Sequence, residues 1–196
     1  MTHETTRIEA FSDGVFSIAA TLLVLDLKAP PATLPFWQGI AGQWPQYASF
    51  LLSFLFIGIM WINHHRLFSH IVRSDDVLMV TNLLLLLGVV WIPYPTSLMA
   101  QAVVNGRLRD AAIFYNGSYL ALALLFNLLL FTCTARGLVD RNYAGVRGIA
   151  RSYAAGPLMY ILCLATSWWS VPLSLAINGG VAIYFLVSPD RERKDR

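Results

Sequence analysis

Charged residues are scarce in this chain. Asp, Glu, Lys and Arg make up 13% of its 196 residues, which is about half of their share in a typical soluble domain. Hydrophobic residues make up 57%, and the mean hydropathy is +0.58. Cysteine is also rare, and the chain contains two, Cys133 and Cys163. Both lie in apolar runs that are typical of buried side chains. These shortages argue against a soluble globular protein, a disordered chain and a disulfide-stabilised secreted scaffold.

The sequence motifs of common enzymes and channels are absent as well. The chain contains no G-x-S-x-G, no H-E-x-x-H, no phosphate-binding loop and no dinucleotide fingerprint. It lacks the T-V-G-Y-G segment of the usual carbonyl-lined potassium filter, and its fourth span carries no arginine ladder of the voltage-sensing kind. We therefore expect no enzymatic activity, no cofactor and no nucleic-acid partner.

Long apolar runs are what the sequence does contain. A membrane-crossing helix needs about 20 predominantly apolar residues. Several stretches without acidic or basic residues approach or exceed that length, and the last, 152–189, can hold two short spans with a turn at Trp168–Pro172. The sequence therefore predicts an all-α membrane protein whose single domain covers residues 1–196. Its six spans are expected at about 6–28, 46–68, 77–100, 111–134, 152–168 and 171–188, and five spans is the alternative.

Two features break this pattern of apolar runs. Residues 29–45 are rich in proline and polar residues, so we expect a loop between the first two spans. Pro93 and Pro95 are expected to kink or end the third span, because proline lacks the backbone N–H that a helix interior needs.

Basic residues are distributed unevenly around the six expected spans. Eleven of the 14 Lys and Arg residues fall on the side that holds both termini, whereas Lys28, Arg107 and Arg109 fall on the other side. Loops rich in Lys and Arg remain in the cytoplasm. The sequence therefore predicts a multi-pass cell-membrane protein with both termini in the cytoplasm, and its basic tail, 191–196, is expected to anchor to lipid headgroups.

The first span, 6–28, is unusual because acidic residues flank a short apolar run. On a helical wheel with 100° per residue, Ile18, Leu22 and Leu25 share one face, and Asp13 lies nearly opposite. Charge within a membrane helix is costly and usually faces protein or water. We therefore expect this helix to lie centrally rather than toward lipid.

Two interpretations of the first helix stay open on the pattern alone. In one, the apolar face packs on neighbouring helices and Asp13 is an ordinary capping or interface residue. In the other, Ser12 and Asp13 bind polar groups of adjacent helices while the apolar face meets a symmetry axis. Copies of Ile18, Leu22 and Leu25 would then form stacked apolar rings, which can close a pore by dewetting.

Polar partners for such an arrangement lie in the next two spans. His64 and His65 end the second span, and Asn82 opens the third. A metal site with His70 as a third ligand is an alternative, but adjacent residues of a helix point about 100° apart. We therefore expect structural hydrogen bonds and no metal site, with pH sensing by the histidines as the remaining alternative.

Three strings in the first half of the chain resemble one known family. Residues 7–13, Arg-Ile-Glu-Ala-Phe-Ser-Asp, are similar to the R-x-x-x-F-S-D signature of the endolysosomal potassium channel family, also called the transmembrane protein 175 family. The W-x-x-H-H-R-L-F string at 61–68 and the leucine run from Asn82 to Pro95 also look like that family. The expected six spans match its short bacterial members, which carry one six-helix unit per chain.

This resemblance implies a homotetramer in the lipid bilayer whose first helix lines a central pore for potassium ions, with weak selectivity over sodium. It implies that Ile18, Leu22 and Leu25 are the pore constrictions and that the Thr21 hydroxyl assists selectivity. It also implies an inter-helix network that holds the pore helix. The implied network residues are Arg7, Phe11, Ser12, Asp13, Trp61, His64, His65 and Asn82. The wheel does not explain Arg7, which falls on the pore side.

Other functions remain as hypotheses. A proton-conducting or proton-coupled transporter would exchange protons at Asp13 and at His64 or His65, in an assembly of one or two chains. A membrane scaffold would carry no flux at any voltage or ion gradient.

Overall fold

The computed structural model describes residues 3–140 and 144–187. Regular structure in these residues is helical, apart from one isolated β-bridge between Ile71 and Val139. The all-α expectation is thereby confirmed for the described residues. The helices are α1 (His3–Leu22), a 3-10 turn η1 (Leu23–Asp26), α2 (Phe36–Gly42), α3 (Trp44–Phe68), α4 (Asp76–Trp91), α5 (Pro93–Asn105), α6 (Leu108–Ala135), α7 (Ala144–Thr166) and α8 (Val171–Val187).

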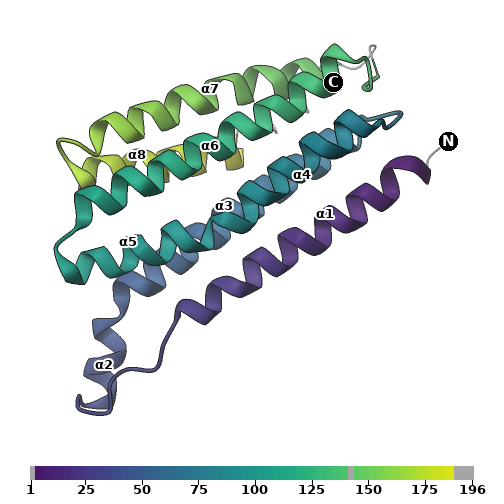
Figure 1. Ribbon diagram of the computed structural model, residues 1–196. Coiled ribbons are helices and arrows are strands. Elements are labelled where there is room, and N and C mark those ends of the chain that lie inside the picture. Colours follow the sequence, from purple (N-terminus) through teal and green to yellow (C-terminus); the bar gives the residue numbers. More distant parts are fainter. Residues whose placement is uncertain (1–2, 141–143, 188–196) are drawn as a thin grey trace.

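The long helices run side by side in one elongated bundle, with α1 along one edge (Figure 1). α1 packs against α3 and α4, whereas α6 contacts α4, α5, α7 and α8. Leucines and aromatic residues fill the interior, among them the fully buried Leu85, Tyr119 and Phe126. The first helix is therefore peripheral within a single chain.

Four helical stretches are long and apolar enough to cross a membrane. They are Thr5–Asp26, Trp44–Phe68, Asp76–Val103 and Leu108–Ala135. Two further apolar helices, Tyr153–Thr166 and Val171–Phe185, are shorter. Four of the six expected spans are thus long and apolar enough to cross a membrane. The helices begin and end within about five residues of the positions expected for the spans, except at α7, which begins at Ala144 rather than near 152. Position 188 and the basic tail, 191–196, lie outside the described residues.

The third expected span is divided into two helices. α4 ends at Trp91 and α5 begins at Pro93, with Ile92 between them. Pro93 has no N–H to donate to a carbonyl one turn back, so the helix breaks where the sequence places the proline. α5 ends at Asn105, and the next residue, Gly106, has a φ of 72°, a left-handed conformation that glycine adopts without strain.

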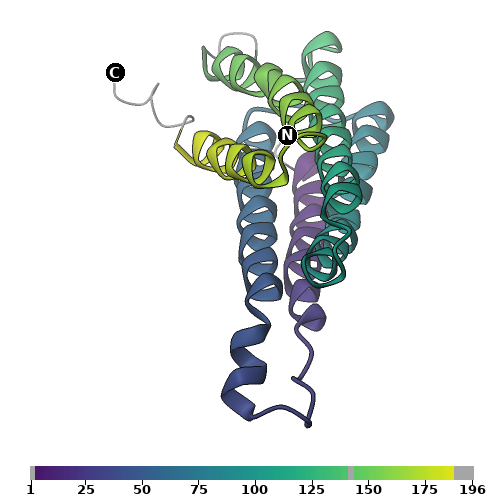
Figure 2. The same cartoon turned by 90° about the vertical axis from the view of Figure 1, so that its left-hand side faces the viewer.

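The linker between α1 and α3 differs from the expected loop. It contains α2, which extends beyond the end of the bundle (Figure 2). Pro35 precedes the first residue of this helix, and the prolines of the linker lie outside its seven residues. Gly39 lies so close to Pro30 that an added Cβ would approach the proline Cβ to 2.6 Å.

At the opposite end of the bundle, two connecting segments bind each other. The Val72 N–H donates to the Leu138 carbonyl across 2.9 Å, and the Asp140 N–H donates to the His70 carbonyl across 3.2 Å. The Asp75 carboxylate accepts the Leu78 N–H at the start of α4 and also pairs with Arg136. We call the segments 69–75 and 136–140 the loop clasp, which fixes the α3–α4 turn to the end of α6.

Candidate functional site

α1 and the η1 turn that continues it have two chemically distinct sides. Ser12, Phe16, Ala19 and Leu23, which recur at a spacing of three or four residues, are buried against α3 and α4. On the other side, Ile18, Leu22 and Leu25 are 58%, 43% and 70% exposed. We call these last three the apolar stripe. Exposure of three large apolar side chains to water is unfavourable, so the apolar stripe requires lipid or another protein surface against it.

Thr21 lies next to the apolar stripe and is also exposed. Its hydroxyl lies 3.0 Å from the carbonyl oxygens of both Ser17 and Ile18, one turn back on its own helix. Because the hydroxyl proton is used within the helix, the Thr21 oxygen presents its remaining lone pairs outward.

A buried polar network ties α1 to α3 and α4. The Asn82 amide Nδ2 donates to Ser12 Oγ across 3.0 Å, and Asn82 Oδ1 lies 2.8 Å from His64 Nε2. Since the amide oxygen only accepts, this contact needs a proton on His64 Nε2. Ser12 Oγ donates in turn to the Ile8 carbonyl across 2.8 Å. The three side chains are at most 1% exposed, so each polar group has replaced water by a partner.

Aromatic rings hold the His64 imidazole in place. It stacks on Phe68 with ring centroids 4.2 Å apart, and Phe16 of α1 lies 5.4 Å from it. The ring orientation that reaches Asn82 is thus fixed by packing on two sides, which makes His64 a rigid part of the contact between α1 and α3.

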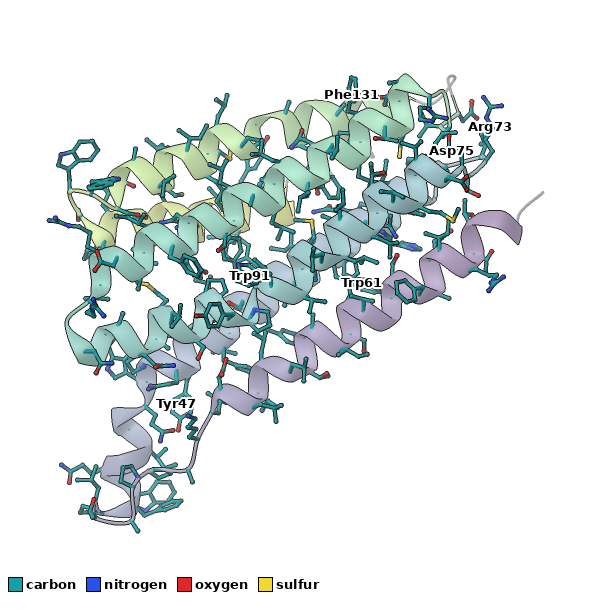
Figure 3. The ribbon with its side chains drawn as sticks, in the orientation of Figure 1. Tyr47, Trp61, Arg73, Asp75, Trp91 and Phe131 are labelled. Carbon is teal, nitrogen blue, oxygen red and sulfur yellow. The ribbon has the colours of Figure 1, made fainter. Side chains whose placement is uncertain are left out.

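Asp13 contacts a different residue of α3. The Trp61 indole Nε1 donates to Asp13 Oδ1 across 2.8 Å, and Figure 3 shows Trp61 between the two helices. Unlike Ser12, both side chains lie at the surface of the single chain. Neighbouring residues of the signature therefore bind α3 and α4 at two separate points.

The remaining residues of the predicted network lie elsewhere. Arg7 and His65 are exposed, and Phe11 is 56% exposed. The contacts just described join Ser12, Asn82 and His64, and separately Asp13 and Trp61, without these three. Within residues 3–140 and 144–187, no group of three or more His, Cys, Asp or Glu side chains could hold a metal ion.

A second polar network lies in the other half of the bundle. Asn116 of α6 donates to Ser167 and Ser174 hydroxyls at 2.8 Å and accepts from Asn178 of α8 at 2.8 Å. Asn127 donates to the Tyr153 carbonyl of α7 across 3.1 Å. These asparagines bridge helices, as polar side chains within apolar spans commonly do.

Sequence reasoning missed the loop clasp and a cavity of mixed polar and apolar lining at the other end of the bundle. The clasp depends on two loops that are about 60 residues apart in the chain, so no local pattern could reveal it. The cavity is lined in part by Gln46, Gln101 and Asp26. All three residues lie near the ends of apolar spans, and these polar positions are the feature of the sequence that could have indicated the cavity.

Comparisons with known proteins give a consistent result. The sequence model described as endosomal/lysosomal potassium channel TMEM175 matches residues 7–93. A protein named as a potassium channel in Streptomyces collinus is 42% identical over 93% of this chain and 92% of its own length. One so named in Chamaesiphon minutus is 43% identical over 93% of each. A crystal structure of a lysosomal potassium-selective channel TMEM175 homolog from Chamaesiphon minutus is similar with a TM-score of 0.86 and 41% identity, covering 95% of this chain and 98% of that one.

Proposed function

Because the chain belongs to the endosomal/lysosomal potassium channel TMEM175 family, we propose that it is a potassium channel whose pore is built from several copies of α1. The resemblance drawn from residues 7–13 is thereby confirmed at the level of the family. The proposed assembly is a homotetramer with six spans per chain, in a cell membrane, with both termini in the cytoplasm.

The apolar stripe is the observation that supports this pore. Ile18, Leu22 and Leu25 are exposed along one side of a helix at the edge of the bundle, so copies of that helix can meet without unpacking the chain. Successive stripe residues lie about one helical turn apart, which would place them in stacked rings. Narrow apolar rings exclude water and thereby ions, so the rings are the proposed constrictions.

The polar side of α1 would hold the rings in position. The buried Ser12, Asn82 and His64 contacts and the Asp13–Trp61 contact join α1 to two helices of its own subunit. As a wall of the proposed pore, α1 would then move only together with α3 and α4. Thr21 would supply a hydroxyl oxygen beside the first ring, and we propose that it assists a weak preference for potassium over sodium.

The experiment is an Ile18→Asn substitution in protein reconstituted into lipid bilayers. A polar ring hydrates more easily than an apolar one, so potassium conductance is expected to rise and the preference over sodium to change. Ile183→Asn on α8 is the matched control, because Ile183 is 63% exposed but lies on another helix. Equal effects of the two substitutions, or none from Ile18→Asn, would contradict the proposed constriction.

A further inference from the structure

A cavity of about 110 Å³ lies where the η1 turn that follows α1 ends, between the start of α3 and the middle of α5. Tyr47, labelled in Figure 3, marks this end of α3. Apolar side chains, among them Phe50 and Ala100, form part of the lining, and the remainder is one acid, one base and several neutral amide and hydroxyl groups. A lining of this mixed kind fits an amphiphilic molecule better than a bare ion.

Asp26 and Lys28 bring opposite charges to the cavity. Leu27 between them has φ −81° and ψ 94°, an extended conformation. Residues on either side of an extended residue point the same way, which explains how both side chains reach one cavity. Asp26 is partly buried, Lys28 is exposed, and no ion pair joins the two within residues 3–140 and 144–187. The cavity therefore offers two separate charges of opposite sign, as a zwitterionic ligand requires.

The cavity lies at the depth where apolar spans end. The span Thr5–Asp26 ends there, Trp44–Phe68 begins there, and Asp76–Val103 ends just beyond the lining residue Gln101. The ends of such spans meet the headgroup region of a bilayer. Trp44 is 62% exposed at the same level, and tryptophan is enriched at the membrane–water interface. The zwitterion that a membrane supplies at this depth is a phospholipid headgroup.

The neutral lining groups favour one kind of headgroup. Hydroxyl and amide oxygens, among them those of Ser49, Ser97 and Gln43, can accept hydrogen bonds near Asp26. A primary ammonium donates three such bonds, whereas a quaternary ammonium donates none and is recognised by several aromatic rings together. Phe50 is the single aromatic residue among the described residues that line the cavity. The lining therefore fits a primary ammonium and not a choline group.

We propose that this cavity binds the headgroup of a phospholipid that carries a primary ammonium, as phosphatidylethanolamine does. The ammonium lies beside Asp26, the phosphate lies beside Lys28, and the glycerol and first acyl carbons contact the apolar lining at Phe50. A lipid held in this way joins the end of α1 to α3 and α5. The inference goes beyond the proposed channel function, because the binding does not depend on whether the chain conducts potassium.

Native mass spectrometry of the full chain in detergent tests the headgroup preference. The probes are phosphatidylethanolamine, phosphatidylcholine and phosphatidylglycerol with identical acyl chains. Phosphatidylethanolamine is expected to bind about two- to fivefold more tightly than either, the range of a partly exposed ion pair, because the other two lack either the N–H donors or the cation. Phosphatidylethanolamine that binds no more tightly than both other lipids overturns the proposal.

Substitutions assign the two charges. Asp26→Asn should remove the advantage of phosphatidylethanolamine over phosphatidylglycerol, whereas Lys28→Gln should weaken all three lipids alike, because each carries a phosphate. Asp110→Asn and Arg109→Gln are the matched controls, since both residues are exposed at the start of α6 and lie outside the cavity. Equal losses in the cavity variants and their controls overturn the proposed site.

Two further measurements separate binding from folding and lipid from a soluble compound. Without lipid, the cavity variants should unfold at the wild-type temperature, and added phosphatidylethanolamine should raise that temperature less in the variants than in the wild type. Free phosphoethanolamine carries both charges but no acyl chain, so it should compete only weakly. Competition by phosphoethanolamine at the same concentration as the lipid overturns the assignment to a lipid.

Discussion

Trp61 on α3 donates its indole N–H to the Asp13 carboxylate on α1 across 2.8 Å. The contact joins an acidic side chain of α1 to the neighbouring helix at a point where neither side chain is buried within one chain. Its loss would therefore loosen α1 without opening a cavity in the core.

Trp61→Phe is expected to lower the stability of the protein by about 1 kcal/mol, the scale of a hydrogen bond between membrane helices, and to alter potassium conductance. Asp13→Asn should have the smaller effect on stability, because the amide oxygen can still accept the indole proton. Thermal unfolding in detergent and bilayer recordings measure the two effects. Trp91→Phe is the matched control: its indole donates to Ser118 between α4 and α6, away from α1, so conductance should stay unchanged.

The same Asp13→Asn variant separates the channel from a proton-exchanging transporter. A transporter that moves protons through Asp13 would lose pH-driven flux altogether. The proposed channel instead keeps passive potassium flux down its gradient in this variant. Abolition of potassium flux in a folded, correctly assembled Asp13→Asn protein would favour the transporter.

Asn82→Ala is expected to destabilise the protein by about 1–3 kcal/mol, because His64 and Ser12 each lose a partner in a buried setting. Ser12→Ala should cost less, since Ser12 donates the other bond to its own helix. A double-mutant cycle of the two substitutions, followed by thermal unfolding, measures their coupling. Strictly additive losses would show that the 3.0 Å contact contributes no stability.

Acid is expected to weaken the loop clasp in two stages. Burial lowers the pKa of the His70 imidazole below its ordinary 6.5. The unfolded chain therefore binds the imidazole proton more readily than the folded chain does, and the free energy of unfolding declines as the pH falls below 6.5. The Leu78 backbone N–H and then Arg136 lower the pKa of Asp75 below 3.8. The Asp75 contribution is therefore complete above pH 3.8 and is lost as the pH falls through the lowered value.

Unfolding temperatures measured across this pH range check both stages. Asp75→Asn should flatten the profile below pH 3.8, while the amide oxygen keeps the cap on the Leu78 N–H. His70→Asn should flatten the profile between pH 6.5 and pH 3.8 and leave the Asp75 stage, below pH 3.8, intact. Identical profiles for the wild type and both variants would show that the clasp does not titrate.

Apolar run length and helical periodicity account for what could be predicted of this fold. The runs that underlie α3 and α6 are long enough to fix these helices within a few residues. The wheel placed Ile18, Leu22 and Leu25 on one face, and all three are exposed, Ile18 and Leu22 on α1 and Leu25 on η1. Their role as constrictions stays a prediction, because exposure within one chain is equally compatible with contact with lipid.

Features that depend on contacts distant in sequence could not be predicted. Asp75 and Arg136 are 61 residues apart, so their pairing follows from how α4 packs beside α6. α2 was missed because the prolines around it indicate a loop, although its seven residues contain none. The R-x-x-x-F-S-D motif contains both Ser12 and Asp13. Only the folded structure shows that Ser12 is buried and that Asp13 is exposed.

The peripheral place of α1 has a genetic consequence. If each subunit contributes one edge helix to a shared conduit, a single codon change is repeated around the whole circumference. In a cell that makes altered and normal chains together, mixed assemblies would outnumber pure ones, and a lesion on the apolar stripe would behave as dominant. A lesion confined to the interior of the α6–α7–α8 half would lower the abundance of its own product and be recessive.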